Sequence, residues 1–126
     1  MKKIILVIAL VIGVGVAVNA QTKPAEFKFE AETHDFGKIP LNKPAVYTFN
    51  FTNTGNQPAI ITEAKVECSC TTVDFPKQPI APNQSAKVIV KFDTKSVYDR
   101  QDRIVEIISN AKNSAQKIRF KGVVLK

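Results

Sequence analysis

The strict alternation of apolar and polar residues over several short segments constrains the fold of this chain more than any other feature. Phe27 and Phe29 flank a lysine at the start of the pattern. The same period of two recurs in three later segments, 47–52, 87–92 and 117–121. Because successive side chains of a β-strand point to opposite faces, each segment predicts a strand with one buried and one exposed face. Three further runs complete a set of about seven predicted strands: 59–62, 64–73 and 104–109.

Turn-forming residues separate these segments at short intervals: 36–37, 53–56, 79–84 and 110–114. No stretch after the first 20 residues shows the sustained apolar period of an amphipathic helix. The pattern predicts an all-β domain, an immunoglobulin-like sandwich with Greek-key connections. A closed barrel stays open as an alternative, because alternation alone does not separate the two architectures.

The N-terminal residues have the three-part layout of a secretory signal peptide. A lysine pair precedes an uncharged run at 4–18, and small or modest residues follow at Val18 and Ala20. We expect a helical signal peptide over residues 1–20, cleaved between Ala20 and Gln21. The alternative, a membrane anchor, is less favoured because the uncharged run is shorter than the roughly 20 residues that span a bilayer.

Cleavage would leave one small domain outside the cytoplasm, either periplasmic or extracellular, with no stable membrane span. Within it we expect a lead-in and first strand at 21–29, followed by the immunoglobulin-like domain at 30–126. The full chain has a formal net charge of +7, and the basic excess is spread along the sequence. It could favour acidic polymers or anionic membrane surfaces, although a solvated basic surface is the commoner explanation. Nucleic acid is not an expected partner, because no basic run is interleaved with stacking aromatic residues.

Five motifs occur in one order along the chain: 34–39 (HDFGKI), 49–55 (FNFTNTG), 68–72 (CSCTT), 80–83 (IAPN) and 121–124 (KGVV). In this combination residues 30–125 resemble the bacterial family called domain of unknown function number 1573. The resemblance implies an immunoglobulin-like sandwich related to abnormal-spindle, hydin and major-sperm-protein domains. It also implies a commonly exported protein without an established biochemical activity. The chain departs from the usual family pattern at Ser69 and Asn83, where glycine is common.

Most of these motifs are interpreted as structural. We expect Gly55 to take a positive φ in a chain reversal, and Phe36 to plug the core with Gly37 relieving its turn. Asn83 is expected to tolerate a left-handed turn nearly as glycine does.

Cys68 and Cys70 are the only cysteines and the only chemically distinctive feature of the chain. Four interpretations stay open: packed thiols, a local or intermolecular disulfide, a metal site, or thiol–disulfide catalysis. A strand holds residues i and i+2 roughly 6.5 Å apart, so a bond between them requires a bulge or turn at Ser69. We expect a dithiol or a Cys68–Cys70 disulfide, without bound metal.

No catalytic constellation is recognisable, and we expect neither an enzyme nor a cofactor. His34 is the only histidine and is interpreted as a surface or turn residue. No glycine-rich phosphate loop is present, and the aspartates around Tyr98 lack the regular spacing of a calcium loop. These aspartates are expected to form a polar connection with exposed ion pairs: Asp93, Asp99 and Asp102.

The favoured function is a binding or structural module of the cell envelope, with an unknown envelope protein or acidic surface as partner. Lys117, Arg119 and Lys121 share one face of the last predicted strand. This basic ladder is interpreted either as a docking surface or as charge that protects a sheet edge from pairing. The alternative function is a periplasmic thiol-redox or metal-handling protein that uses Cys68 and Cys70.

Overall fold

The computed structural model describes residues 23–95 and 97–126, which form eight β-strands and no helix. The predicted signal peptide lies outside these described residues. The strands are β1 (Phe27–Phe29), β2 (Thr33–Ile39), β3 (Ala45–Asn53), β4 (Ile61–Val66), β5 (Thr71–Asp74), β6 (Ser85–Phe92), β7 (Asp99–Ser109) and β8 (Gln116–Val124). The all-β prediction is confirmed, with one strand more than the seven expected.

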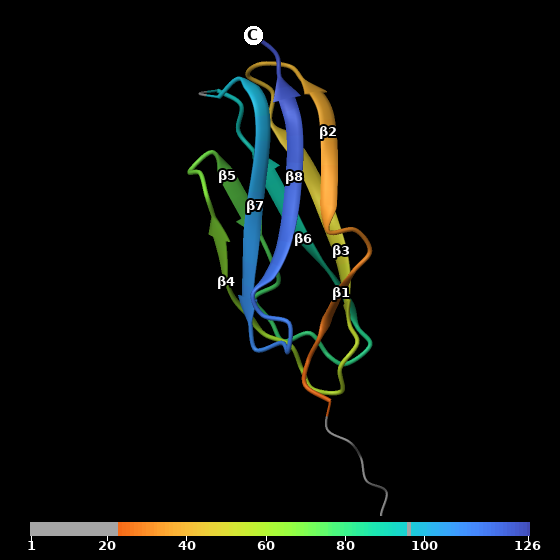
Figure 1. Ribbon diagram of the computed structural model, residues 1–126. Coiled ribbons are helices and arrows are strands. Elements are labelled where there is room, and N and C mark those ends of the chain that lie inside the picture. The colour runs from red at the N-terminus through yellow and green to blue at the C-terminus, as the bar shows by residue number, and fades with distance from the viewer. Residues whose placement is uncertain (1–22, 96) are drawn as a thin grey trace, which may run out of the picture.

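The strands form two four-stranded sheets that face each other (Figure 1). One sheet has the order β1-β3-β6-β5 and the other the order β2-β8-β7-β4. Most consecutive strands lie in different sheets, which gives the crossover connections of a Greek-key sandwich. Neither sheet closes on itself, so the barrel alternative is excluded.

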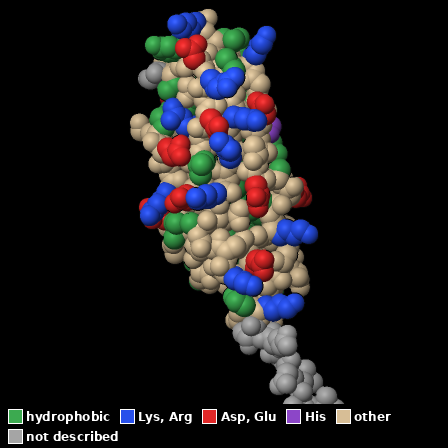
Figure 2. All heavy atoms as spheres, in the orientation of Figure 1, with side chains coloured by type: hydrophobic (Ala, Val, Ile, Leu, Met, Phe, Trp, Pro, Cys, Tyr) green, Lys and Arg blue, Asp and Glu red, His purple; other side chains and the backbone are tan. Residues whose placement is uncertain are grey.

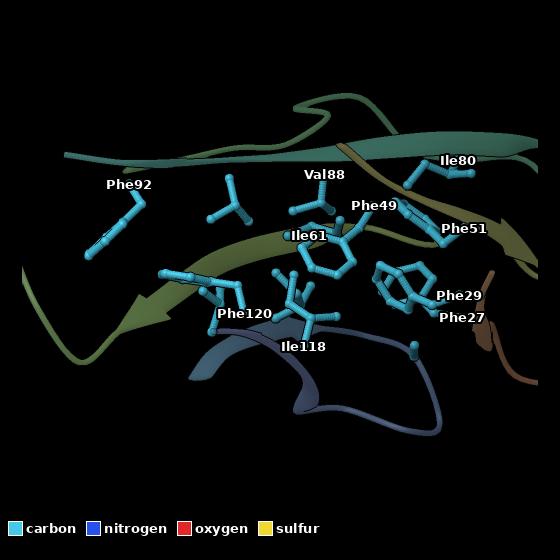
Figure 3. Packing of buried hydrophobic residues seen from close by; sticks show 14 of the residues in the cluster. Phe27, Phe29, Phe49, Phe51, Ile61, Ile80, Val88, Phe92, Ile118 and Phe120 are labelled. Atoms are coloured by element: carbon cyan, nitrogen blue, oxygen red, sulfur yellow. The ribbon is translucent and has the colours of Figure 1, made fainter. Parts of the chain in front are cut away.

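The alternating segments supply the core between the two sheets. Phe49 and Phe51 of β3 are each 1% exposed, and Phe92 of β6 is fully buried. Figure 3 shows aromatic groups at both ends of this core, Phe27 against Phe51 and Phe92 against Phe120. Their ring centroids lie 4.8 and 5.3 Å apart, respectively. The period of two is therefore the pattern that builds the sandwich, since each inward side chain contributes about 1.5–3 kcal/mol on burial.

Two predicted segments are wrong in extent. The run 64–73 is not one strand, because β4 ends at Val66 and β5 begins at Thr71, in the opposite sheet. The run 59–62 contributes only its last two residues to β4, while Ala59 forms an isolated bridge with Ile80. A chain that changes sheets must break its ladder, and the break falls at the cysteines.

Strand β7 begins five residues earlier than predicted, so the expected polar connection at Asp99 and Asp102 is part of a strand. Its first half alternates poorly because polar side chains point inward there. Gln101 is 7% exposed and donates from Nε2 to the carbonyl of Tyr98 at 2.8 Å. Arg103 Nη2 in turn donates to Gln101 Oε1 at 2.8 Å. The inward side chains here are polar and hydrogen-bonded. The sequence of this half of β7 therefore lacks the apolar–polar alternation that predicts a strand.

The turn glycines have different roles from one another. Gly37 has a positive φ of 67°, but it lies inside β2, where the β2–β8 pairing shifts register, so the turn predicted at 36–37 is wrong. Gly55 does not have the predicted positive φ. A Cβ there would overlap the Pro24 carbonyl oxygen and lie 2.8 Å from the Cα of Ala25, so Gly55 is a close-approach position. Asn83 has a φ of 64°, which confirms that it replaces glycine in a left-handed turn.

Candidate functional site

The two cysteines lie in the turn that carries the chain from β4 in one sheet to β5 in the other. A disulfide joins Cys68 to Cys70, whose Cα atoms are 5.1 Å apart. This distance is shorter than a flat strand allows, because the chain bends at the exposed Ser69. Both cysteines are half-buried, and Cys70 packs against the core.

Backbone hydrogen bonds hold this turn independently of the sulfur–sulfur bond. The Thr71 N–H donates to the Cys68 carbonyl at 3.1 Å, and the Asp93 N–H donates to the Cys70 carbonyl at 2.7 Å. The Cys70 N–H also points at Cys68 Sγ, 3.2 Å away. An N–H directed at sulfur stabilises a thiolate there after reduction.

The disulfide closes a ring of three residues, and a small ring adds little stability. The chain-entropy relation gives about 1.6 kcal/mol for such a loop, against about 3 kcal/mol for one of 15 residues. Among residues 23–95 and 97–126, no group of three or more histidine, cysteine or acidic side chains lies together. A structural zinc site needs four ligands, so the described residues near Cys68 and Cys70 do not supply one.

The basic ladder lies on the outer face of β8, between β7 and β2. Because β8 is an inner strand, the interpretation of the ladder as edge protection is wrong. Arg119 donates from Nε and Nη2 to the two carboxylate oxygens of Asp102, at 2.6 and 2.8 Å. This pair lowers the pKa of Asp102 through its hydrogen bond, and raises that of Arg119.

The other two members of the ladder also face acidic neighbours. Lys117 is opposite Glu106 of β7, and Lys121 lies between Asp102 of β7 and Asp35 of β2. Figure 2 shows the resulting mixture of acidic and basic side chains over this face. The surroundings of the ladder therefore weaken its attraction for an acidic partner, and the docking role stays a prediction.

Strand β4 is an edge strand with a shallow depression beside it. It pairs only with β7, and its register is regular from Glu63 to Val66 after one irregularity. The depression has a volume of about 240 Å³ and lies on the outer side of the β4–β7 pair. Its lining residues are Lys65, Val66, Glu67, Ile104 and Glu106. A second depression, of about 340 Å³, lies over β2, β7 and β8. Its lining residues are Asp35, Arg100, Gln101, Asp102, Lys121, Gly122 and Val123.

His34 is a strand residue in an aromatic cluster, which corrects its interpretation as a surface or turn histidine. It lies on β2 and stacks on Tyr47 of β3, with ring centroids 3.6 Å apart and planes 9° from parallel. Phe36 meets its edge at 4.7 Å. Burial lowers the pKa of His34, and the nearby Asp35 opposes this shift only in part. The contacts are those of a packing residue rather than a proton-transfer site.

Asn53 is a central polar residue that the sequence interpretation missed. It is fully buried, and its Nδ2 donates to the carbonyls of Gln57 and Ile80 at 2.8 and 3.0 Å. Its Oδ1 accepts from the N–H groups of Gly55 and Glu26 at 3.1 and 3.3 Å. The sequence did indicate that this side chain is buried, because the alternation of Phe49 and Phe51 places the next inward side chain at position 53.

The predicted cleavage residues Ala20 and Gln21 lie outside the described residues. Within residues 23–95 and 97–126, no helix is long and apolar enough to cross a membrane.

Solved structures show the same fold at low sequence identity. A protein of unknown function from Porphyromonas gingivalis W83 has a TM-score of 0.72 and 14% identity over 81% of this chain and 48% of that chain. The ASH/PapD-like domain of human CEP192 has a TM-score of 0.64 and 6% identity over 82% of this chain and 87% of that domain. The YadV chaperone has a TM-score of 0.57 and 9% identity over 80% of this chain and 53% of that chain.

These likenesses show an immunoglobulin-like, PapD-like fold and nothing finer, and this chain spans about half the length of the P. gingivalis protein. Comparison with curated proteins gives no match. The family model described as "Protein of unknown function (DUF1573)" matches residues 27–124. The ordered motifs, the two-sheet fold and this match together show that the chain belongs to the DUF1573 family.

Proposed function

We propose that this protein is an exported, non-catalytic binding module of the cell envelope, periplasmic or extracellular, whose protein partner docks on the free edge of β4. The observation that carries the proposal is the unpaired edge of β4 beside the 240 Å³ depression. Export is supported by the signal-peptide pattern of residues 1–20.

The other three edges are poorer templates for an added strand. Strand β1 has three residues and β5 has four. Strand β2 is interrupted at Gly37, where its register with β8 shifts. Short length and irregular register are the devices by which proteins block pairing at an edge. Strand β4 has six residues, more than β1 or β5, and its one irregularity, between Ile61 and Glu63, leaves the run Glu63–Val66 regular, so this edge is the proposed site for strand addition.

The depression beside β4 indicates the chemistry of the partner. The half-buried Ile104, on the outer face of β7, gives the depression an apolar contact for one side chain of an added strand, while Val66, which pairs with the buried Val105, is 38% exposed at the sheet edge. Glu67 and Glu106 border the same depression. Lys65 borders it as well, so the charges around the depression are mixed, and a partner strand that places an apolar side chain over Ile104 fits it best.

The fold likeness to a chaperone and to an ASH/PapD-like domain supports a role in binding. Sandwich domains commonly act by presenting edges and loops on a rigid scaffold. No sequence motif for a catalytic nucleophile or phosphate cradle competes with this assignment.

Photo-crosslinking in cells tests the proposal. A benzophenone amino acid at position 66 should form a defined adduct with one envelope protein, while the same probe at Lys87, exposed on the other sheet, should not. Adding Glu63→Pro to the position-66 probe protein should abolish the adduct, provided that thermal unfolding shows the sandwich to be intact. Equal crosslinking from positions 66 and 87 would contradict docking at β4.

A second candidate function is disulfide exchange at Cys68 and Cys70. In the proposed reaction, a thiolate of a dithiol donor attacks Cys70 Sγ and the Cys68–Cys70 bond breaks. Cys68 leaves as a thiolate that faces the Cys70 N–H. The second donor thiol then attacks the mixed disulfide, so the donor is oxidised to a disulfide and Cys70 is released as a thiol.

Titration with reduced and oxidised glutathione, read as intact mass after alkylation, tests this candidate. Exchange chemistry predicts reversible reduction while the far-ultraviolet circular dichroism of the sandwich stays unchanged. Reduction that occurs only when the protein unfolds would contradict it, because the disulfide would then be a structural one.

A further inference from the structure

Exposed apolar side chains gather at one end of the sandwich. Five of the seven large hydrophobic residues exposed in the described chain belong to segments 38–46, 91–100 and 123–126. We call the described residues of these three segments the C-terminal pole. Its exposed apolar residues are Leu41, Val46, Tyr98, Val123 and Leu125.

Specific contacts bring these segments together. The Leu125 N–H donates to the Ile39 carbonyl at 2.8 Å, which fixes the last residues beside the end of β2. Thr94 Oγ1 donates to the Lys43 carbonyl at 2.8 Å, which ties the segment after β6 to the loop before β3. The Lys126 ammonium lies 4.7 Å from the centre of the Tyr98 ring. Figure 1 shows these segments converging where the C-terminus lies.

The same pole carries most of the excess positive charge. It holds six basic side chains and two acidic ones, all exposed, whereas the rest of the described chain holds ten basic and nine acidic ones. The basic excess is spread along the sequence, as expected, and the fold gathers most of it at this pole. The charged residues of the pole are Lys38, Lys43, Lys91, Lys95, Arg100, Lys126, Asp93 and Asp99.

We propose that the C-terminal pole binds the surface of an anionic phospholipid bilayer. Aliphatic and aromatic side chains that enter the headgroup region, surrounded by lysine and arginine, match that surface in both polarity and charge. An acidic polymer would use the charges but not Leu41 or Leu125. A second copy of the chain would bring two positive poles together, which charge repulsion opposes.

This inference deepens the proposed function by placing the binding module on a membrane. The inference depends on export only for which cellular bilayer is bound. Binding to vesicles can be measured whether or not the protein is exported. The β4 edge lies away from the C-terminus (Figure 1), so a partner and a bilayer can be held at the same time.

Vesicle flotation of the chain starting at Gln21 tests the inference. This chain retains the whole core, which begins at Ala25, and lacks the apolar run at 4–18 that would itself bind lipid. We expect it to float with vesicles of phosphatidylglycerol and phosphatidylcholine in equal parts, and not with phosphatidylcholine alone. Added salt should reduce the bound fraction.

Paired variants separate the pole from charge in general. K43Q/K126Q should weaken binding about tenfold or more, since each basic residue near an anionic surface contributes roughly a factor of five. L41S/L125S leaves the charge unchanged and should also weaken binding. K112Q/K117Q removes the same charge as the first pair from the opposite end of the sandwich, where β7 turns into β8, and should change binding less than twofold, because a charge far from the bilayer is largely screened. Equal losses in both lysine pairs would overturn the assignment to the pole.

A fluorescent probe distinguishes a bilayer from an acidic protein or polymer. The chain has no tryptophan, so Tyr98→Trp adds a single reporter at the pole and Ile60→Trp adds one at a distant loop. The emission of the first should shift to shorter wavelength on phosphatidylglycerol vesicles, and that of the second should not. Binding to polyglutamate without any shift on vesicles would overturn the proposal.

Discussion

Asn53 connects more separate parts of this domain than any other single polar side chain described above. Its amide bonds to the segment before β1, to the loop after β3 and to the carbonyl of Ile80. The alternation of β3 points it inward, so its four polar contacts take the place that an apolar residue would fill. The motif residues Asn53 and Gly55 therefore have structural roles, in hydrogen bonding and close packing, and no catalytic role is assigned to them.

Asn53→Ala should destabilise the domain by about 3 kcal/mol, because it removes the acceptor of the Gly55 and Glu26 N–H groups and all four hydrogen bonds of the buried side chain. Urea unfolding measures the loss. Thr54→Ala, at an exposed neighbour whose hydroxyl makes one long hydrogen bond of 3.4 Å, is the matched control and should cost far less. Equal costs for the two variants would contradict the role given to Asn53.

Gly55 and Gly37 should respond differently to substitution. Gly55→Ala should cost about 1–3 kcal/mol, since the added methyl meets the backbone of Pro24 and Ala25, which cannot rotate away. Gly37→Ala should cost about 1–2 kcal/mol through its left-handed backbone alone, because nothing lies within 4 Å of the new Cβ. Asparagine tolerates that backbone, so Gly37→Asn should recover stability while Gly55→Asn should not. Recovery at both sites would contradict the close-approach assignment of Gly55.

His34 should make stability fall on mild acidification. Its pKa in the folded state lies below the ordinary value of 6.5 because of burial, so the unfolded chain takes up a proton first as the pH decreases. The His34 contribution is complete above pH 6.5 and is lost as the pH falls from there toward the folded pKa.

Urea unfolding at about pH 7.5 and about pH 5 measures this loss. His34→Phe keeps an aromatic ring against Tyr47 and should lose less stability than the parent protein over the same interval. The same loss in both proteins would contradict its assignment to His34.

At the scale of elements, the connection between β4 and β5 combines an edge strand, a change of sheet and a disulfide. The sequence predicted β3, β6 and β8 well, because each has an uninterrupted apolar face. It did not predict the break at 67–70, since this turn contains none of the glycine, proline or asparagine that usually mark one. It missed the first half of β7 because Gln101 and Arg103 point inward.

Replacing both cysteines by serine should lower the unfolding free energy by about 1–2 kcal/mol, as expected for a ring of three residues. The backbone hydrogen bonds of Thr71 and Asp93 should keep the turn in place. Thermal unfolding of C68S/C70S, compared with the oxidised parent protein, measures the effect. Loss of the folded state would contradict the view that the disulfide is dispensable for the fold.

At the scale of the whole molecule, the fold distributes the basic residues of the sequence over two different surfaces. Acidic partners surround the ladder on β8, whereas basic and apolar residues remain at the C-terminal pole. The docking-surface interpretation of the ladder rested on spacing along one strand. Charges on neighbouring strands, which depend on the pairing of β7 and β2 with β8, were not visible in that spacing.

The central claim is that this sandwich works outside the cytoplasm, and the intact mass of the native protein in fractionated cells tests it most directly. Export predicts a chain that begins at Gln21, recovered with the cell envelope or in the medium, and a substantially unprocessed precursor after Ala20→Arg. A native chain that retains residues 1–20 and is recovered with the soluble cytoplasmic proteins would contradict export.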